Sequence, residues 1–171
     1  MQPKELHATD RLLLLERDGW EFVERKKGKA AVAVIAVTDA SELVLTEQAR
    51  KPVDARVIDL PAGLIGDEDP HAGAAETAKK ELDEETGFAC QRVELLTTGT
   101  SSPGITSERV VLARAHGLTR TGAGGGVGGE NITVHVVPLE GIGDWLRSRE
   151  KEGILIDLKV WSGLYFVTKS S

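Results

Sequence analysis

Short apolar runs bounded by turn residues make up much of the chain, and a few longer amphipathic segments lie among and after them. Short runs that are rich in β-branched residues predict strands. These runs are 12–15, 20–25, 30–38, 42–47, 56–60, 92–98, 109–115 and 132–137. Apolar positions at helical spacing predict helices over 73–85, 142–150 and 157–167, and Gly87 is placed to end the first of them. The pattern indicates an α+β fold in which a sheet lies between helices.

Two turn signals separate these segments. Asp18-Gly19 lies between the first two predicted strands, and Asp-Gly is a common hairpin turn. Residues 121–129, TGAGGGVGG, contain so many glycines that we expect this loop to hold no fixed shape unaided. No internal repeat and no shift in composition marks a second domain.

The chain has 171 residues, enough for a domain with a substantial core, and a formal net charge of −6. This charge argues against a general nucleic-acid-binding protein, which needs a basic face. Cys90 is the single cysteine, so we expect no internal disulfide and a reducing compartment. Residues 1–10 are polar, and no apolar run approaches the ~20 residues that span a bilayer. We therefore expect a soluble cytoplasmic protein without a membrane partner.

Three glutamates, Glu81, Glu84 and Glu85, lie near the end of the first predicted helix. Positions three and four apart are neighbours on a helix surface, so Glu81 faces both of the others. Carboxylates this close repel one another unless a positive charge lies between them. Hard divalent cations such as Mg²⁺ bind through a few carboxylates together with substrate phosphates. The cluster is therefore either a metal site for a phosphate-bearing substrate or only a solvated acidic face.

The order of residues around these glutamates favours the metal site. Residues 80–88, KELDEETGF, resemble the second half of the Nudix signature, Arg-Glu-apolar-x-Glu-Glu-x-Gly-apolar, with Lys80 in place of the arginine. Residues 61–65, PAGLI, resemble the ADP-ribose and nucleoside-diphosphate-sugar pyrophosphatase branch of that superfamily. The resemblance implies a Nudix-type α/β/α sandwich with a mixed β-sheet over residues 30–171, preceded by an N-terminal strand pair within residues 1–29.

The first half of the signature departs from the family pattern. The usual spacing would place the opening glycine at Gly66 and leave Ala72 where the family has a glutamate. Starting from Gly63 puts Asp69 in that position and leaves three extra residues before the helix, and we prefer this register. In the family, the first glutamate mainly braces the loop against the helix. The departure therefore concerns loop geometry more than the metal ligands.

Two further segments resemble substrate-binding elements of the same branch. Arg50, in Glu47-Gln48-x-Arg50, corresponds to an arginine that meets the pyrophosphate, for which a planar guanidinium is well shaped. Glu108 ends residues 102–108, SPGITSE, and corresponds to a glutamate on the sugar side of the substrate. Without the resemblance, Arg50 would be an ordinary surface residue and Glu108 a solvated turn residue.

The N-terminal residues 20–25, WEFVER, resemble a segment that crosses to the partner subunit of a swapped homodimer in some relatives and stacks the base on its tryptophan. The resemblance implies that Trp20, Glu21 and Arg25 bind substrate and that residues 1–29 form a dimerisation segment. The alternative for Trp20 is that it caps the core of a hairpin.

Glu130 follows the glycine-rich loop, where the branch carries the catalytic base or a further metal ligand. The resemblance implies that Glu81 and Glu85 hold Mg²⁺ or Mn²⁺, with Glu84 and the carbonyl group of Ala62 in support. The proton of the attacking water then passes to Glu130 or to a glutamate of the signature. Glu84, Glu85 and Glu130 are therefore the candidate catalytic residues.

The expected function is metal-dependent hydrolysis of ADP-ribose or a related nucleoside-diphosphate sugar to a nucleoside monophosphate and a sugar phosphate. Its expected partners are this substrate and a second copy of the chain. The alternatives are a dinucleoside polyphosphate or coenzyme A pyrophosphatase and a non-hydrolysing regulator that binds nucleotide sugars. An isopentenyl-diphosphate isomerase would need a reactive cysteine before the signature, whereas Cys90 lies after it.

Overall fold

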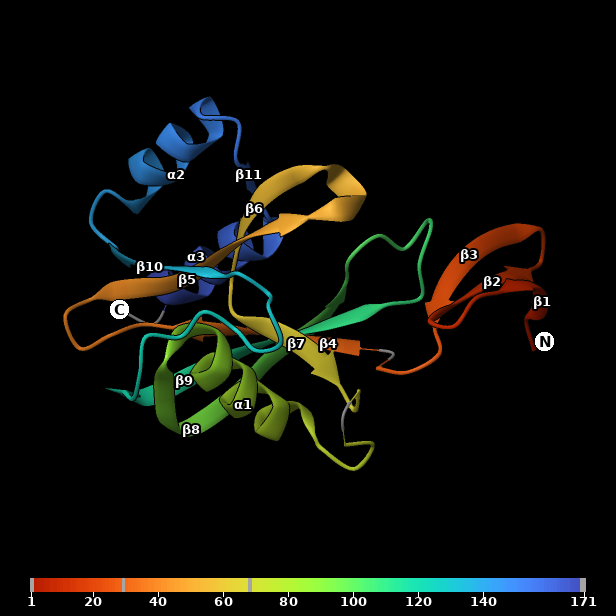
Figure 1. Ribbon diagram of the computed structural model, residues 1–171, viewed down its shortest axis with the longest axis horizontal. Coiled ribbons are helices and arrows are strands. Elements are labelled where there is room, and N and C mark those ends of the chain that lie inside the picture. Colours follow the sequence, from red (N-terminus) through yellow and green to blue (C-terminus); the bar gives the residue numbers. More distant parts are fainter. Residues whose placement is uncertain (1, 29, 68, 170–171) are drawn as a thin grey trace.

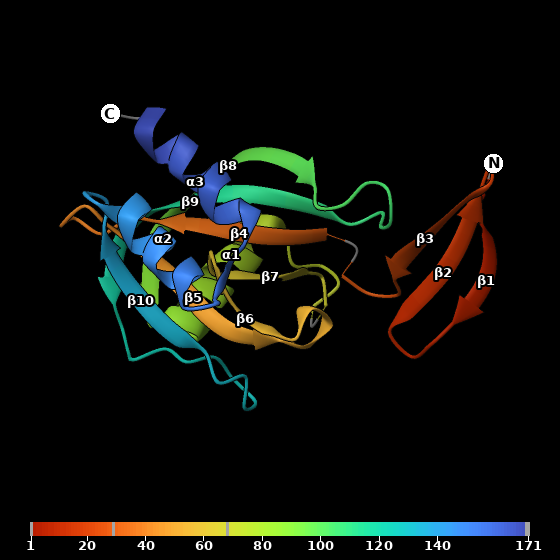
Figure 2. The same ribbon diagram turned by 90° about the horizontal axis from the view of Figure 1, so that it is seen from above.

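The computed structural model describes residues 2–28, 30–67 and 69–169. Within these residues, two four-stranded sheets form the body, and a three-stranded sheet projects from it (Figures 1 and 2). The projecting sheet has the order β1 (Lys4–Ala8), β2 (Leu12–Arg17), β3 (Trp20–Arg25). The body sheets have the orders β10 (Thr133–Pro138), β5 (Glu42–Arg50), β6 (Ala55–Asp59), β11 (Leu155–Ile156) and β7 (Ala62–Ile65), β4 (Ala30–Ala36), β9 (Arg109–Arg120), β8 (Phe88–Thr100). The helical elements are η1 (Lys51–Val53), α1 (Ala74–Thr86), α2 (Ile142–Lys151) and α3 (Leu158–Lys169).

Both body sheets are mixed, and helices cover them on opposite sides. β4 runs parallel to β9 and β6 runs parallel to β11, whereas the other neighbouring strands are antiparallel. Alternate residues of β4 face different layers. Val32 and Val34 pack in a cluster with Leu82 of α1, and Ile35 packs in a cluster with Val160 of α3. This arrangement confirms the predicted α+β fold. None of the described helices is long and apolar enough to cross a membrane.

The structure differs from the predicted elements at three strands. The expected N-terminal strand pair is a three-stranded sheet, because β1 adds to the edge of β2. All residues of β1 are exposed, so no apolar pattern marks it in the sequence. β7 covers Ala62–Ile65, where no strand is predicted, and β11 has two residues, which is too short to leave a pattern. The expected boundary between residues 29 and 30 adjoins Lys29, which lies outside the described residues.

The projecting sheet meets the body at the end of β3. The N–H of Val23 donates to the carbonyl oxygen of Ile105 at 2.8 Å, and the N–H of Ser107 donates to the carbonyl oxygen of Val23 at 3.2 Å. Beside them, Nε of Arg25 lies 2.7 Å from Oε1 of Glu108. These contacts join the end of β3 to the loop that carries the predicted substrate-binding glutamate.

The glycine-rich loop is held by the end of α1. Gly87 ends the helix in a left-handed conformation with φ 69°, as predicted. The last carbonyl groups of a helix have no partner within it. Here the N–H of Gly125 donates to the carbonyl of Glu85 at 2.9 Å, and the N–H of Gly126 donates to the carbonyl of Glu84 at 3.1 Å. Hydrogen bonds to the end of α1 therefore fix the conformation of the glycine-rich loop.

Two glycines with positive φ allow a matched test of this packing. A Cβ at Gly87 would overlap the backbone of Gly122, whereas a Cβ at Gly19 would meet nothing within 4 Å. Gly19→Ala should lower the free energy of unfolding by about 1–2 kcal/mol, the cost of a left-handed conformation. Gly87→Ala should lower it by roughly 2 kcal/mol more, because backbone must move as well. Urea denaturation measures both, and equal losses would show that the loop does not pack on the helix end.

Candidate functional site

A cleft of about 2070 Å³ brings most of the predicted site residues together. Its walls come from β5, β6, β9, α1 and α3, and it exceeds the roughly 300–1,000 Å³ of a typical small-molecule site. An extended ligand therefore fits. The predicted site residues that line the cleft are Arg25, Arg50, Ala62, Glu81, Glu84, Glu85, Glu108 and Glu130. Trp20 and Glu21 are not among its lining residues.

Glu85 is the buried carboxylate of the site. Its side chain is 5% exposed, and Oε2 accepts a hydrogen bond from the N–H of Ala62 at 3.0 Å. Burial raises the pKa of the Glu85 carboxyl to about 8, and the charges of Glu81 and Glu130 add to this rise. The N–H of Ala62 and the charge of Arg50 act in the opposite direction. Burial is thus the main reason why the Glu85 carboxyl favours its protonated form here.

The other two glutamates of the cluster lie beside Glu85 on α1. Glu81 packs directly against Gly63, because a Cβ at this glycine would overlap the carboxyl group of Glu81. A side chain at the position that opens the preferred register of the signature would therefore displace the carboxyl group of Glu81. Glu84 pairs with Lys80, whose Nζ lies 3.2 Å from Oε2. Lys80 thus supports the cluster from one helical turn away.

The oxygen donors of the cleft fit a hard divalent cation. Carboxylates and a backbone carbonyl are the ligands that Mg²⁺ and Mn²⁺ prefer. The described residues contain no group of three His, Cys, Asp or Glu side chains already close enough to hold one ion. The protein alone therefore does not form a closed cage. Mg²⁺ commonly binds through one or two carboxylates and completes its shell with water and substrate phosphates.

Arg25 and Glu108 pair at the N-terminal rim of the cleft. Nε of Arg25 donates to Oε1 of Glu108 at 2.7 Å, and the hydroxyl of Ser101 donates to Oε2 at 3.4 Å. The N–H of Glu108 donates to the hydroxyl of Thr106 at 3.1 Å. Two of the five residues that the family resemblance assigns to the substrate are thus in contact with each other.

Glu130 is folded onto its own loop. Its Oε2 accepts the N–H of Val127 at 3.1 Å, and the residue is exposed. A Cβ at Gly126 would overlap the side chain of Glu130, so the loop needs a glycine there. Because the same loop is bonded to the carbonyls of Glu84 and Glu85, the loop that carries Glu130 is fixed to the helix end that bears the signature.

Trp20 lies away from the cleft of its own chain. It is 68% exposed, so it does not cap a hairpin core. It begins β3, and Arg25 ends the same strand. At ~3.3 Å per residue, the two side chains lie roughly 17 Å apart along the strand. Glu21 is also exposed near the far end of the projecting sheet. Neither residue lines the cleft of its own chain in this structure.

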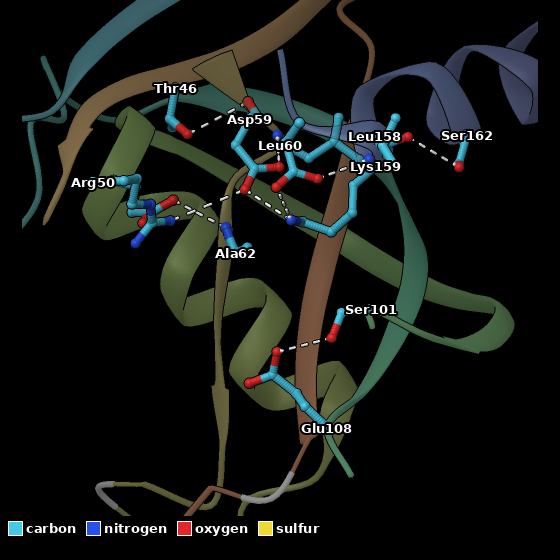
Figure 3. A network of polar contacts seen from close by, with 12 residues as sticks. Thr46, Arg50, Asp59, Leu60, Ala62, Ser101, Glu108, Leu158, Lys159 and Ser162 are labelled. Carbon is cyan, nitrogen blue, oxygen red and sulfur yellow. Dashed lines mark hydrogen bonds and ion pairs between the residues drawn. The ribbon is translucent and has the colours of Figure 1, made fainter. Parts of the chain in front are cut away.

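Two charged residues of the cleft were missed by the sequence reasoning. Asp59, at the end of β6, is 3% exposed, and Nζ of Lys159 on α3 lies 3.0 Å from its Oδ2 (Figure 3). A terminal nitrogen of Arg50 lies 4.0 Å from the same oxygen. Burial raises the pKa of Asp59, and the attraction of Lys159 opposes that rise. The available signal was an aspartate at the end of an apolar strand, which calls for a positive partner.

Comparisons with known proteins show which family the chain belongs to. Residues 27–153 match the model described as NUDIX domain. A methanol dehydrogenase activator of Bacillus methanolicus is 43% identical over 91 residues, 53% of this chain and 47% of that protein. An ADP-ribose pyrophosphatase of Bacillus subtilis (strain 168) is 35% identical over 111 residues, 58% of this chain and 57% of that protein. The chain thus spans about half the length of these two relatives.

A longer match is a GDP-mannose pyrophosphatase of Enterobacter sp. (strain 638), which is 30% identical over 167 residues, 88% of this chain and 85% of that protein. The crystal structure of an ADP compounds hydrolase shares the fold with a TM-score of 0.66 and 22% identity, covering 99% of this chain and 94% of the other. The family-model match includes the whole signature and most of the chain. The chain therefore belongs to the NUDIX domain family.

Proposed function

We propose that this protein hydrolyses the pyrophosphate bond of ADP-ribose or of a related nucleoside-diphosphate sugar with Mg²⁺ or Mn²⁺. One observation carries the proposal: the signature glutamates, Arg50 and Glu108 line the same cleft. Carboxylates beside a guanidinium suit a substrate whose phosphates bind a divalent cation and an arginine together. The names of two relatives, an ADP-ribose and a GDP-mannose pyrophosphatase, support this class of substrate.

The residues that would hold the ion are Glu81 and Glu85, with Glu84 and the carbonyl of Ala62 in support. When bound, the ion lowers the pKa of a ligand water and neutralises charge on the phosphates. The N–H of Ala62 fixes one oxygen of Glu85, so the carboxylate is oriented by the fold itself. Lys80 orients Glu84 in the same way.

Glu130 accepts the proton of the attacking water in this proposal, and Glu84 or Glu85 is the alternative base. Water attacks one phosphorus in line, the bond to the bridging oxygen breaks, and the other phosphate leaves with that oxygen. ADP-ribose gives AMP and ribose 5-phosphate. The hydrogen bonds from the glycine-rich loop to the end of α1 support the role of Glu130, because they keep its loop beside the signature.

Arg50 and the pair formed by Arg25 and Glu108 bind the substrate on either side of the scissile bond. The planar guanidinium of Arg50 matches phosphate oxygens, and its side chain is 44% exposed in the cleft. Glu108 accepts hydrogen bonds from the sugar hydroxyls, and Arg25 keeps its carboxylate in place.

Trp20 and Glu21 of a second copy complete the base site. The exposed tryptophan on a projecting sheet (Figure 2) supports this, because its indole face is free to stack on a base. The homodimer is therefore part of the proposed function.

Turnover on a substrate panel tests the reaction. The panel contains ADP-ribose, ADP-glucose, GDP-mannose, UDP-glucose, diadenosine polyphosphates and coenzyme A, each with Mg²⁺, and phosphate release is coupled to a phosphatase. We expect Glu85→Gln to lower turnover on the best substrate by ~10³-fold or more, the scale of losing a strong electrostatic stabiliser.

The matched control is Glu140→Gln, because Glu140 is an exposed glutamate outside the cleft. Retention of a tenth of the activity by Glu85→Gln would contradict the assignment of Glu85. Tight binding of ADP-ribose without turnover by the unmodified protein would favour a binding regulator instead.

The raised pKa of Glu85 predicts how stability without metal depends on pH. A carboxyl whose pKa rises from 4.5 unfolded to about 8 folded favours the protonated folded state. Its contribution is complete below pH 4.5 and is lost as the pH rises toward 8. In EDTA, the free energy of unfolding should therefore fall from pH 5 to pH 8 relative to Glu85→Gln, whose amide does not titrate. Mg²⁺ should reverse the loss at pH 8, and parallel curves in EDTA would contradict this prediction.

Mixed dimers test the shared base site. Trp20→Ala should raise KM by roughly 10- to 100-fold with kcat nearly kept, because stacking is worth ~1–3 kcal/mol per base. Co-expression of Trp20→Ala with Glu85→Gln should restore about one quarter of the sites. If the chains pair at random, half of the dimers contain one chain of each variant, and each of these dimers holds one intact site. The activity is measured at substrate concentrations below KM. If the co-expressed protein is no more active than the sum of the two single variants, Trp20 acts at the cleft of its own chain or at no cleft.

A further inference from the structure

The cleft contains a charged cluster that the proposed mechanism leaves without a role. Lys159, near the start of α3, places Nζ 3.0 Å from Oδ2 of Asp59 and 2.7 Å from Oδ2 of Asp157 (Figure 3). The same oxygen of Asp59 lies 4.0 Å from a terminal nitrogen of Arg50. α3 begins after the family-model match ends at residue 153. A helix beyond the matched region thus contributes a charge to the site.

Asp59 needs a positive partner because it is buried at 3% exposure. Its Oδ1 accepts the N–H of Leu60 at 2.8 Å, so Oδ2 is the oxygen that faces the cations. Lys159 lies within hydrogen-bond distance of Oδ2, whereas Arg50 does not. Burial by itself would lower the pKa of Lys159, but the charges of Asp59 and Asp157 hold this pKa above its usual value. Lys159 is therefore the charged partner that neutralises Asp59.

Arg50 and Lys159 compete for this one oxygen. A guanidinium pairs with a carboxylate through two parallel N–H···O bonds, whereas an ammonium group acts as a point charge. Arg50 ends β5 and is 44% exposed, so its side chain has room to move either toward Asp59 or toward a ligand in the cleft. While Lys159 neutralises Asp59, the attraction between Asp59 and Arg50 stays weak.

We propose that Lys159 is a positioning residue that neutralises Asp59 and so keeps the guanidinium of Arg50 available for the substrate's pyrophosphate. This inference rests on the proposed function, because it assigns Arg50 to the pyrophosphate. Without Lys159, Oδ2 of Asp59 draws the guanidinium of Arg50 into an ion pair, and the substrate loses its guanidinium contact. Without the charge of Asp59 as well, Arg50 stays available. Neutralising Asp59 therefore cancels the loss that removal of Lys159 causes.

Two other roles for Lys159 give different results. If Lys159 itself touched a phosphate, its removal would cost affinity whether or not Asp59 were charged. If Lys159 served stability alone, its removal would lower the melting temperature and leave KM unchanged in the protein that remains folded. The combination of Asp59 and Lys159 variants separates these cases, because only the positioning role predicts cancellation.

The first test is kinetic and uses the best substrate of the panel. Lys159→Met should raise KM and lower kcat/KM by roughly 10- to 100-fold, the range for losing one hydrogen bond between charged groups. The double variant Asp59→Asn with Lys159→Met should recover kcat/KM to within about threefold of Asp59→Asn alone. Lys159→Arg, which keeps the positive charge, should rescue most of the loss. Lys151→Met is the matched control, because Lys151 is an exposed lysine of α2 outside the cleft.

A second comparison covers the case in which Lys159→Met does not fold. Asp59→Asn and the double variant both lack the buried negative charge, so neither leaves an unpaired carboxylate at residue 59. Equal kcat/KM for these two proteins supports the proposal. A further tenfold loss in the double variant overturns it and assigns Lys159 to the substrate.

The third test does not depend on turnover. The side-chain Nε–H signal of Arg50 in NMR spectra, assigned with Arg50→Lys, reports the pairing of its guanidinium. Lys159→Met should shift this signal and slow rotation about the Nε–Cζ bond, and the double variant should restore it. If the signal responds but no panel compound is cleaved, the proposed function fails and the pairing stands. If cleavage is normal but neither the signal nor KM responds to Lys159→Met, the inference is overturned.

Discussion

The hydrogen bond from the N–H of Ala62 to the carboxylate of Glu85 joins the two halves of the cleft. It ties the last turn of α1 to the first residue of β7, 23 positions earlier in the chain. Because Glu85 is buried, the bond forms in a low dielectric, where an unpaired carboxylate is costly. With this contact in place, Gly63 must approach Glu81 without a side chain, and the exposed edge of α1 turns toward the cleft. The geometry of the signature thus depends on one buried bond.

The parts of the site that could be predicted from the sequence are those whose residues lie close together in the chain. Glu81, Glu84 and Glu85 are set together by helical spacing, so their common edge was predictable. Arg50 ends β5 and Glu108 lies in the loop before β9, and both entered the prediction through the family resemblance alone. Asp59 and Lys159 are far apart in the chain, and their contact depends on how α3 packs on the body. A buried aspartate predicts a positively charged partner, but no pattern near Asp59 in the sequence identifies Lys159 as that partner.

The strands show the same division between local and non-local signals. Apolar runs that face the core, such as β4, were predictable because burial demands them. β1 is an exposed edge strand, and its pairing with β2 leaves no trace in its composition. The glycine-rich loop is an intermediate case. Its glycine content predicts that it holds no fixed conformation by itself. The carbonyl groups at the end of α1 that lack partners within the helix accept its N–H groups and fix its conformation. This contact is apparent only when the loop and the helix end are considered together.

The charges of the cleft argue that metal and substrate bind together. Lys80 is paired with Glu84, and Lys159 is paired with Asp59, so Arg50 is the cation near the signature that is least committed to a carboxylate. A pyrophosphate adds negative charge to a site where burial and neighbouring carboxylates already raise the pKa of Glu85. One guanidinium does not balance both sets of charges. Under the proposed function, a divalent cation shared between the glutamates and the phosphates would balance them, and each of the two ligands would strengthen the binding of the other.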